Sequence, residues 1–340
     1  MKAGHHGIKK LKETDMKKIL AFIVLSVAMV SCYEDYIKDY THSAIYFPYQ
    51  IDVRTFVVGE GMKIEVGAAL GGVRENTRDR NVSYILDGSL LPAALASMKV
   101  ASQGYIKNSV APVATLTQLP STHYTNSNSS TMVIKKGWHS GTVVIKPDSV
   151  NFLNDSLKTL YAYYALPFYI TEADADSLVK DRRSNVVGLK FENMLFGKYW
   201  HGGRAIVERP GLPNDTVRYK TSIPSPEGLV WELKTAGPTT LVTNGYLNTT
   251  TGKDELKITL KGTKIYVSSA AGSSFTYSGD GESIYNAPKL LQNRKIFLKY
   301  KYTNTSNNYV YHCTDTLTFR NRLRDGINEW QDENPSHYGK

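Results

Sequence analysis

The feature that most constrains this chain is a two-residue alternation of apolar and polar side chains, repeated in short segments that turn residues separate. The clearest case is residues 295–302, where four apolar side chains alternate with four others: Ile296, Leu298, Tyr300 and Tyr302 against Lys295, Phe297, Lys299 and Lys301. Such alternation is typical of β-strands with one buried face. The 23 tyrosines among 340 residues also suit half-exposed strand surfaces. We therefore expect an all-β protein.

Seven strand-like segments occupy the first half of the chain: Ala44–Pro48, Met62–Leu70, Asn81–Leu86, Thr131–Ile134, Thr142–Ile145, Leu160–Ile170 and Asn185–Phe191. The fourth and fifth flank a glycine-containing turn, which predicts a hairpin. The sixth is the most apolar and predicts a central strand, with Leu166, Phe168 and Ile170 on one face. Residues 106–130, rich in Ser, Thr, Asn and Pro, predict a long loop, and no amphipathic helix is evident. The pattern favours an immunoglobulin-like β-sandwich over residues 44–193.

Residues 196–340 predict a second, antiparallel β-domain. Its strand-like segments are Thr216–Thr221, Leu229–Leu233, Thr239–Val242, Glu255–Leu260, Lys264–Ser268, Ser274–Tyr277, Lys295–Tyr302 and Tyr309–Arg320. Eight or more such strands either close into a small barrel or stack as a sandwich. The tail from Asn321, with Leu323, Ile327 and Trp330, is expected to form a short covering helix.

Residues 16–31 have the layout of a secretory signal peptide. Two lysines precede the apolar run Ile19–Val30, and the small residue Ser31 stands directly before Cys32. Twelve helical residues span about 18 Å, which is short for a hydrocarbon core of about 30 Å. Residues 1–15 fit no region of a signal peptide, and we interpret them as a start codon assigned too early. An ordinary signal peptide with an incidental cysteine is the alternative.

The charge of the chain argues against nucleic acid as a partner. The whole sequence is formally +10; the first 31 residues hold six lysines and two acids, which leaves +6 from Cys32 onward. This excess is spread along the chain and not gathered into one dense run. Cys313, the second of two cysteines, lies in an alternating segment and is expected to be a packed strand residue in a fold without disulfides.

Motifs for catalysis, cofactors and metals are not evident. The sequence has no Gly-x-Ser-x-Gly, His-Glu-x-x-His, phosphate-binding glycine loop or Cys-x-x-Cys. The acids of Glu172–Asp176 lack the spacing of a calcium loop and are followed closely by Lys180 and Arg182, so a salt-bridged loop is the better interpretation. We expect no catalytic residues, no cofactor and no metal.

The order of these segments resembles a known family. Ala28–Cys32 is similar to a lipobox in the looser form of Bacteroidetes lipoproteins. The sandwich contains Tyr164-Ala165-Leu166-Pro167, the second domain opens with Gly197-x-Tyr199-x-x-Gly202, and it closes with the run Asp315–Arg322. Together they resemble the Bacteroidetes surface lipoproteins encoded with polysaccharide-utilisation systems. The N-terminal domain of that family also precedes some endo-β-N-acetylglucosaminidases, whose Asp-x-x-Asp-x-Asp-x-Glu strand is absent here. Gly197-Lys198-Tyr199-Trp200 also resembles the first strand of lipocalin-type barrels.

The resemblance implies cleavage before Cys32 and lipidation of that residue, followed by a tether over residues 32–43. Glu34 and Asp35 resemble the acidic signal that directs Bacteroidetes lipoproteins to the outer face of the outer membrane. The implied role is non-catalytic capture of an oligosaccharide or polysaccharide, beside an outer-membrane importer complex.

Sugar capture without catalysis requires exposed aromatic faces with polar side chains beside them. Candidates are the aromatic residues Trp138, Trp200, Trp231, Tyr246, Tyr277 and Tyr285. Trp138 stands in the predicted hairpin turn, and Tyr246, Tyr277 and Tyr285 are expected near loop tips. Core positions are the alternative for all of them, and the stronger one for Trp200 and Trp231, which lie within strands.

Two other functions stay open from the sequence. One is a structural or adhesive surface protein, such as a pilus-associated subunit or a host-attachment subunit. The other is an unrecognised hydrolase, for which no pair of carboxylates is placed across a cleft.

Overall fold

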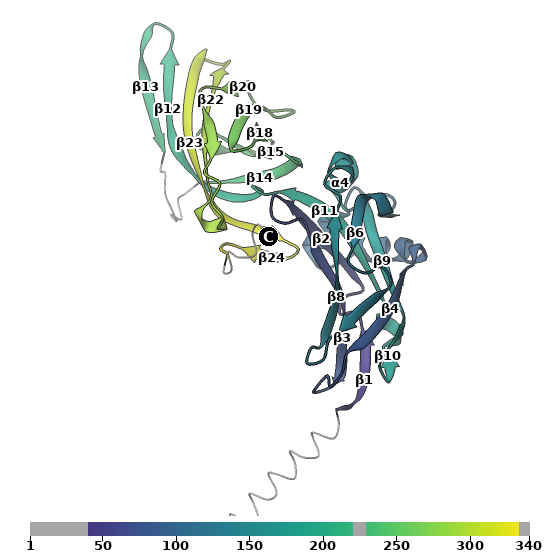
Figure 1. The fold of residues 1–340 in the computed structure, drawn as a ribbon. Coiled ribbons are helices and arrows are strands. Elements are labelled where there is room, and N and C mark those ends of the chain that lie inside the picture. The colour runs from purple at the N-terminus through teal and green to yellow at the C-terminus, as the bar shows by residue number, and fades with distance from the viewer. Residues whose placement is uncertain (1–39, 220–228, 333–340) are drawn as a thin grey trace, which may run out of the picture.

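The computed structural model describes residues 40–219 and 229–332 and shows an all-β protein in which a sandwich and a barrel join end to end (Figure 1). The N-terminal part is a sandwich of two sheets, and the C-terminal part is one sheet that closes on itself. Cys32, Glu34 and Asp35 lie outside the described residues. Among the described residues, no helix has the length and hydropathy to cross a membrane.

The two sheets of the sandwich are mixed. The first runs in the order β10 (Ser177–Leu178), β1 (Thr41–Tyr46), β3 (Ile64–Val73), β8 (Ser140–Pro147) and β6 (Tyr124–Asn126). The second runs in the order β2 (Ile51–Val58), β11 (Ser184–Asn193), β9 (Tyr164–Ala173), β4 (Arg80–Leu86) and β7 (Thr131–Ile134), with β5 (Thr117–Gln118) beside β9. Most pairs are antiparallel, but β1–β10, β2–β11 and β5–β9 are parallel.

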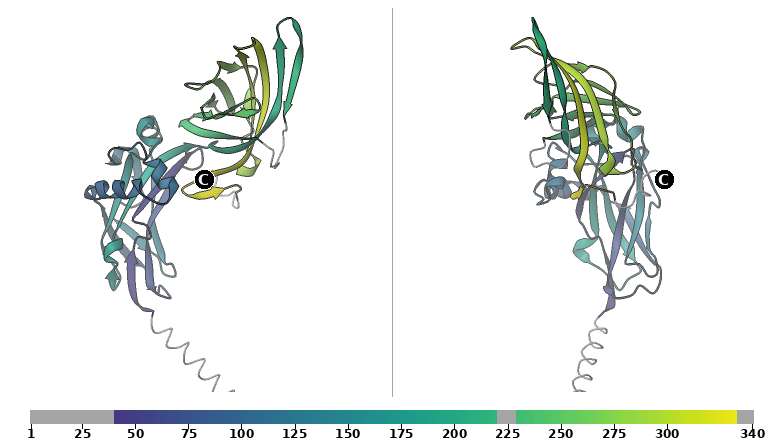
Figure 2. Two further views of the ribbon diagram at one scale, coloured as in Figure 1. Left: turned by 180° about the vertical axis from the view of Figure 1, so that it is seen from behind. Right: turned by 90° about the vertical axis from the view of Figure 1, so that its left-hand side faces the viewer.

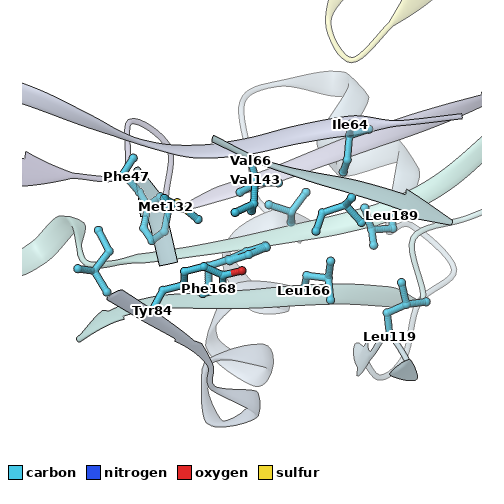
Figure 3. Packing of buried hydrophobic residues seen from close by; sticks show 14 of the residues in the cluster. Phe47, Ile64, Val66, Tyr84, Leu119, Met132, Val143, Leu166, Phe168 and Leu189 are labelled. Atoms are coloured by element: carbon cyan, nitrogen blue, oxygen red, sulfur yellow. The ribbon is translucent and has the colours of Figure 1, made fainter. Parts of the chain in front are cut away.

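The predicted hairpin between residues 131–134 and 142–145 is wrong. Strand β7 pairs with β4 in the second sheet, whereas β8 pairs with β3 and β6 in the first, so the intervening turn crosses between the sheets. Met132 and Val143 therefore face each other across the core instead of lying side by side on one sheet (Figure 3). A hairpin within one sheet and a crossing between the two sheets both bury the same alternate side chains of these strands. The sequence pattern therefore could not distinguish the two arrangements.

Helices absent from the prediction cover the second sheet. Helix α2 (Leu91–Lys99) and helix α3 (Gly104–Ser109) pack against its outer face, and part of the expected loop over residues 106–130 is thus helical. Two single-turn helices follow, α4 (Asn151–Asn154) and α5 (Ser156–Thr159). Strand β9 is central, as predicted, between β11 and β4. Because one face of the sheet meets the first sheet and the other meets these helices, β9 is apolar along most of its length.

The sandwich core is aromatic at its centre (Figure 3). Phe168, on β9, lies with its ring centroid 6.4 Å from that of Phe47 and 5.3 Å from that of Tyr84. Leu166 and Ile170 share this face and are fully buried, as the alternation predicted.

The barrel is closed by eight strands in the order β12 (Gly197–Arg209), β14 (Val230–Gly237), β15 (Thr240–Thr243), β18 (Leu256–Lys261), β19 (Lys264–Ser269), β20 (Tyr277–Gly279), β22 (Lys295–Asn304) and β23 (Tyr309–Arg324). Pairing of β23 with β12 completes the ring. Strand β21 (Ser283–Tyr285) bridges β19 and β22, and β16 (Gly245–Tyr246) pairs with β17 (Thr249–Thr250). Of the two predicted architectures, barrel and sandwich, the barrel is therefore the one observed.

Two extensions leave the ring. Strand β13 (Leu212–Tyr219) forms a long hairpin with β12 that projects beyond the barrel (Figures 1 and 2). At the other end, β23 continues to Arg324 and turns into β24 (Ile327–Glu329). The covering helix predicted from Asn321 is thus wrong, because residues 321–329 form a strand pair that reaches the sandwich.

Candidate functional site

Sandwich and barrel meet at a buried ionic cluster. Glu60 lies in the turn between β2 and β3, where Gly59 and Gly61 both adopt positive φ. Its carboxylate accepts hydrogen bonds from Arg294 at 2.6 Å and from Arg322 at 2.9 and 2.7 Å. The side chains of both arginines are at most 2 % exposed. The sandwich therefore inserts an acid into the end of the barrel, where Arg294, directly before β22, and Arg322, on β23, receive it.

The electrostatics of this cluster favour the ionised carboxylate. Burial alone raises the pKa of Glu60, but the hydrogen bonds and charge of Arg322, and then those of Arg294, outweigh burial and hold the pKa below its usual range. Glu329 on β24 also accepts from Arg322 Nε at 2.5 Å. The junction is thus fixed by paired charges and does not behave as a loose linker.

Three adjoining pockets surround this junction. The largest, about 610 Å³, lies between Tyr161, Lys190 and Phe196 on one side and Glu232 and Lys234 on the other. A smaller one of about 140 Å³ shares Lys190 and Phe196 with it and reaches Tyr105. The third, about 570 Å³, shares Tyr105 with the second.

The third pocket, here called the Tyr49 pocket, combines exposed aromatic surface with polar groups. The sandwich contributes residues before and within β2 and at the start of α3, and the barrel contributes the turn between β23 and β24. Its lining includes Pro48, Tyr49, Gln50, Ile51, Asp52, Arg54, Gln103, Tyr105, Asp325 and Ile327. Tyr49 is 66 % exposed, so its ring is free to contact a ligand.

Two carboxylates lie at the base of the Tyr49 pocket. Asp52 accepts a hydrogen bond from the Tyr105 hydroxyl at 2.9 Å, and Asp325 accepts from the backbone N–H of Thr55 at 3.2 Å. Arg54 lies between them, 3.8 Å from Asp52 and 3.7 Å from Asp325. Burial raises the pKa of both carboxyls despite Arg54.

Two atoms of this set, Arg54 Nε and Asp325 Oδ1, are closed to solvent and have no hydrogen-bond partner among the described residues. A ligand in the pocket would instead meet the accessible polar groups of the lining, because the Arg54 side chain is 39 % exposed and Gln103 is exposed just before α3. A guanidinium group donates hydrogen bonds and an amide both donates and accepts, so together with the Tyr49 ring they form an arrangement suited to a polyhydroxylated molecule.

Of the six predicted aromatic residues, the structure brings Tyr246 and Tyr277 into contact, with ring centroids 5.8 Å apart, but it does not gather the six at one surface. Trp138 is 67 % exposed in the turn after β7, as expected for a loop aromatic. Tyr246 and Tyr285 are half-buried, and the Tyr285 hydroxyl meets Met194 Sδ at 3.7 Å. Trp200 is also half-buried, on the outer face of the barrel, with Arg320 4.8 Å above its ring.

Trp231 and Tyr277 are core residues. Trp231 is fully buried and stacks on His201 with ring centroids 3.9 Å apart. Tyr277 is 3 % exposed and donates to the buried Glu255 at 3.0 Å. The loop-tip position predicted for Tyr277 is wrong, because it opens strand β20 and points into the barrel. Neither ring offers a face to a ligand in this structure.

The barrel interior holds a polar cluster of its own. Asp315 is fully buried and accepts hydrogen bonds from Tyr219 at 2.5 Å and Tyr300 at 2.9 Å. His201 Nε2 lies 3.0 Å from Asp315, but without hydrogen-bonding alignment. Cys313 is buried beside them, as predicted, and burial raises the pKa of its thiol. These groups are packed among aromatic rings, and none of the pockets described above reaches them.

The residues of the Tyr49 pocket are missing from the sequence prediction. They come from residues 48–54, 103–106 and 325–327, which only the fold brings together. One local signal was present: Tyr49 follows Pro48 directly, outside any alternating segment, where a large aromatic has no core to enter. Within the described ranges, no group of three or more His, Cys, Asp or Glu side chains is arranged to hold a metal ion.

Comparison with known proteins gives a family match for the N-terminal part and a fold match for nearly the whole chain. Residues 38–177 match a family model described as an N-terminal domain. A crystal structure of a protein of unknown function from Bacteroides ovatus aligns with a TM-score of 0.60 at 18 % identity, covering 86 % of this chain and 98 % of that one. No curated protein matches the sequence.

A multidomain protein from the same organism aligns with a TM-score of 0.42 at 13 % identity, covering 85 % of this chain and 100 % of that one. The first structure shows that the two-part fold is shared by another protein. The family model covers less than half of the chain, and the structural likeness at 18 % identity shows a shared fold.

Proposed function

We propose that this protein is a non-catalytic glycan-binding lipoprotein of the bacterial surface and that the Tyr49 pocket is its oligosaccharide site. The observation that carries the proposal is the grouping of the exposed Tyr49 ring with the solvent-accessible polar side chains of Arg54 and Gln103 in a pocket of about 570 Å³. Small-ligand sites have this general form, an apolar wall with a few placed polar groups.

Each group has a role in such a site. The C–H face of a pyranose ring stacks on the Tyr49 ring, as apolar surfaces do on aromatic faces. Sugar hydroxyls accept from the Arg54 guanidinium and bond the Gln103 amide, both of which are accessible to solvent. The hydrogen bond from Tyr105 orients Asp52 toward the same space. Recognition by this set requires no bond breaking, and it is compatible with a binding protein.

Placement at the cell surface belongs to the same proposal. Lipidation of Cys32 would anchor the chain by two or three acyl chains, which hold a protein far more firmly than one. Strand β1, the first described element, lies at the end of the sandwich remote from the barrel (Figure 1). An anchor before β1 would therefore hold the junction and the barrel away from the membrane, where an importer complex could receive the glycan.

Calorimetry against an oligosaccharide found with a glycan array tests the pocket. We expect Tyr49→Ala to weaken binding at least about tenfold, equivalent to about 1.4 kcal/mol. Trp138→Ala is a matched control, because Trp138 is 67 % exposed but lies in another turn. Equal affinity of wild type and Tyr49→Ala, with loss in Trp138→Ala, would move the site to that turn.

Absence of binding to every glycan, together with isolation of the protein in large assemblies, would favour the structural or adhesive function instead. Release of sugar products on incubation with candidate glycans would contradict the non-catalytic role. Membrane fractionation of Cys32→Ala cells tests the anchor separately: we expect the protein to become soluble.

A further inference from the structure

The outer face of the barrel carries a flat array of cations over three neighbouring strands. Strands β22, β23 and β12 lie side by side, and their inward residues form the barrel core. On the outward positions, the cationic residues are Lys198, Arg204, Lys295, Lys299, Lys301 and Arg320. We call this surface the basic face. It includes several of the lysines whose alternation marked β22 as a strand.

The register of the three strands arranges these side chains in rows. Lys299 pairs with Thr314, and Thr314 pairs with Arg204 on the far strand. Two outward rows further along, Lys295 pairs with Thr318, which pairs with Trp200. A ladder of threonine hydroxyls therefore runs between two columns that carry the cations. Successive outward residues lie about 6.6 Å apart along a strand, and neighbouring strands about 4.8 Å apart.

The cations of the basic face are not neutralised by the protein. None of the six forms an ion pair with a carboxylate in the part of the chain that the structure describes. The outward positions of the three strands hold one acid, Glu208, whose carboxylate lies 3.4 Å from His312 Nε2. Asp280, from a neighbouring loop, lies 2.7 Å from His312 Nδ1. Both of these acids thus face the histidine at one end of the array. A third acid, Glu232 on β14, stands opposite Lys198 in the register at the other end, so Lys295, Lys299, Lys301 and Arg204 are the cations farthest from acidic side chains.

Apolar surface is interleaved with these charges. Phe297 lies between Lys295 and Lys299 and is 38 % exposed, and its cross-strand partner Ile284 is also exposed. The guanidinium group of Arg320 lies over the ring of Trp200, and this contact holds it against the outer face of the sheet. The face thus offers a ring for stacking, hydroxyls for hydrogen bonds and unpaired cations within one plane.

We propose that the basic face binds an acidic polysaccharide, a linear glycan that carries carboxylate or sulfate groups. Its charges would pair with the lysines and arginines, its hydroxyls with the threonine ladder, and a sugar face with Phe297. Duplex DNA is a poorer fit, because its bases are stacked inside the helix, so it would engage only the cations through its phosphates and leave Phe297 without a stacking partner. The proposal uses a different surface from the Tyr49 pocket and does not depend on it.

Affinity electrophoresis in gels containing polygalacturonate, dextran sulfate or neutral dextran tests this surface. We expect the acidic polymers to retard the protein, and dextran to leave it unretarded. Raising the salt from 50 to 200 mM should reduce the retardation, since screening and counterion release govern such binding.

Two matched triple variants distinguish binding by the arranged cations of the basic face from binding by the net charge of the protein alone. Lys295→Gln, Lys299→Gln and Lys301→Gln together should weaken binding about tenfold or more. Lys99→Gln, Lys107→Gln and Lys146→Gln together remove the same charge from exposed positions of the sandwich and should change binding less than about twofold. Equal loss in both would overturn the proposal, as would no retardation of the wild type.

Phe297→Ala tests the contribution of the aromatic ring to binding, because it leaves the charge of the basic face unchanged. We expect weaker binding of the acidic polymers with an unchanged melting temperature, because Phe297 is outside the core. Binding of duplex DNA or of anionic lipid vesicles in place of the polysaccharides would overturn the assignment of the ligand class. Loss of retardation in Tyr49→Ala, with the lysine triple unaffected, would place the acidic glycan in the Tyr49 pocket instead.

Discussion

Glu60 and Arg322 form a two-point ion pair across the junction, in which Nη1 and Nη2 of the arginine donate to different oxygens of the carboxylate at 2.9 and 2.7 Å. The two residues are 262 positions apart in the chain. Paired hydrogen bonds between guanidinium and carboxylate fix direction as well as distance. This contact therefore sets the angle between the sandwich and the barrel.

Replacing Glu60 by glutamine should destabilise the protein strongly. The change leaves the buried guanidinium group of Arg294 without a counter-charge and leaves Arg322 with Glu329 alone, and loss of one partner from a buried pair costs about 3–5 kcal/mol. Urea unfolding followed by far-UV circular dichroism measures the loss. Glu75→Gln, at an exposed position, is the control and should stay within about 0.5 kcal/mol of the wild type.

The same pair gives the junction a pH dependence. Because the pKa of folded Glu60 is lower than that of an unfolded glutamate, about 4.3, its contribution to stability is complete above that pH. It is lost as the pH falls through the folded value. We expect the stability difference between wild type and Glu60→Gln to shrink in acid. A difference that stayed constant from pH 7 to pH 3 would show that the fold does not lower the pKa of Glu60.

Asp52 should behave in the opposite way to Glu60. Removing its charge should keep or raise the stability of the protein while weakening ligand binding. Burial raises its pKa, so the folded state disfavours the ionised form, and the resulting destabilisation grows as pH rises above about 3.9. Asp52→Asn removes that charge and keeps an oxygen for the Tyr105 hydroxyl. At pH 7 we expect equal or higher stability together with weaker glycan binding. A variant that was clearly less stable would indicate a structural role for the carboxylate.

Gly245 has a close contact that forbids a side chain. A Cβ at this position would lie 2.3 Å from Nε1 of the buried Trp231, which has no room to move. Gly245→Ala should therefore cost about 3 kcal/mol through overpacking. Gly252→Ala, in the same barrel, meets nothing within 4 Å and serves as the control. Chemical unfolding of both variants compares them, and equal stabilities would contradict the packing described here.

Tyr219→Phe tests the buried polar cluster of the barrel. The change removes the donor 2.5 Å from Asp315 and leaves a buried carboxylate with one hydrogen bond fewer. Hydrogen bonds to charged groups contribute about 1.5–3 kcal/mol, so we expect a loss in that range. Tyr266→Phe, on the exposed face of β19, should have little effect. Tryptophan fluorescence during unfolding reports on the barrel, because Trp231 stacks on the neighbouring His201.

Local alternation predicted most of the strands, because each half-buried strand shows its buried face in its own residues. The inward positions of β22 are Ile296, Leu298, Tyr300 and Tyr302, all of them buried. Local alternation did not predict which strands pair. The pattern of β7 and β8 fits a hairpin and a crossing between sheets equally well, since both place the same side chains in the core. Helix α2 carried its own signal, alanines with a proline in the first turn, which the expected all-β class outweighed.

The candidate sites were the least predictable part. Tyr105 and Asp325 of the Tyr49 pocket lie 220 positions apart and become neighbours only when β24 docks on the sandwich. The basic face had the same difficulty, because alternating lysines read singly indicate a solvated strand face. Only the register of β22 with β23 and β12 shows that cations from distant segments meet on one plane.

Strand β11 has a consequence for the order in which the protein can fold during synthesis. It lies between β2 and β9 and is parallel to β2, so β2 is separated from the rest of the second sheet by a gap until residue 193 has been made. The segment that the family model matches ends at residue 177, before this strand. Chains shorter than about 193 residues would expose unpaired edges of β2 and β9, which invite aggregation. The nascent sandwich therefore depends on strand β11, which leads directly into the barrel.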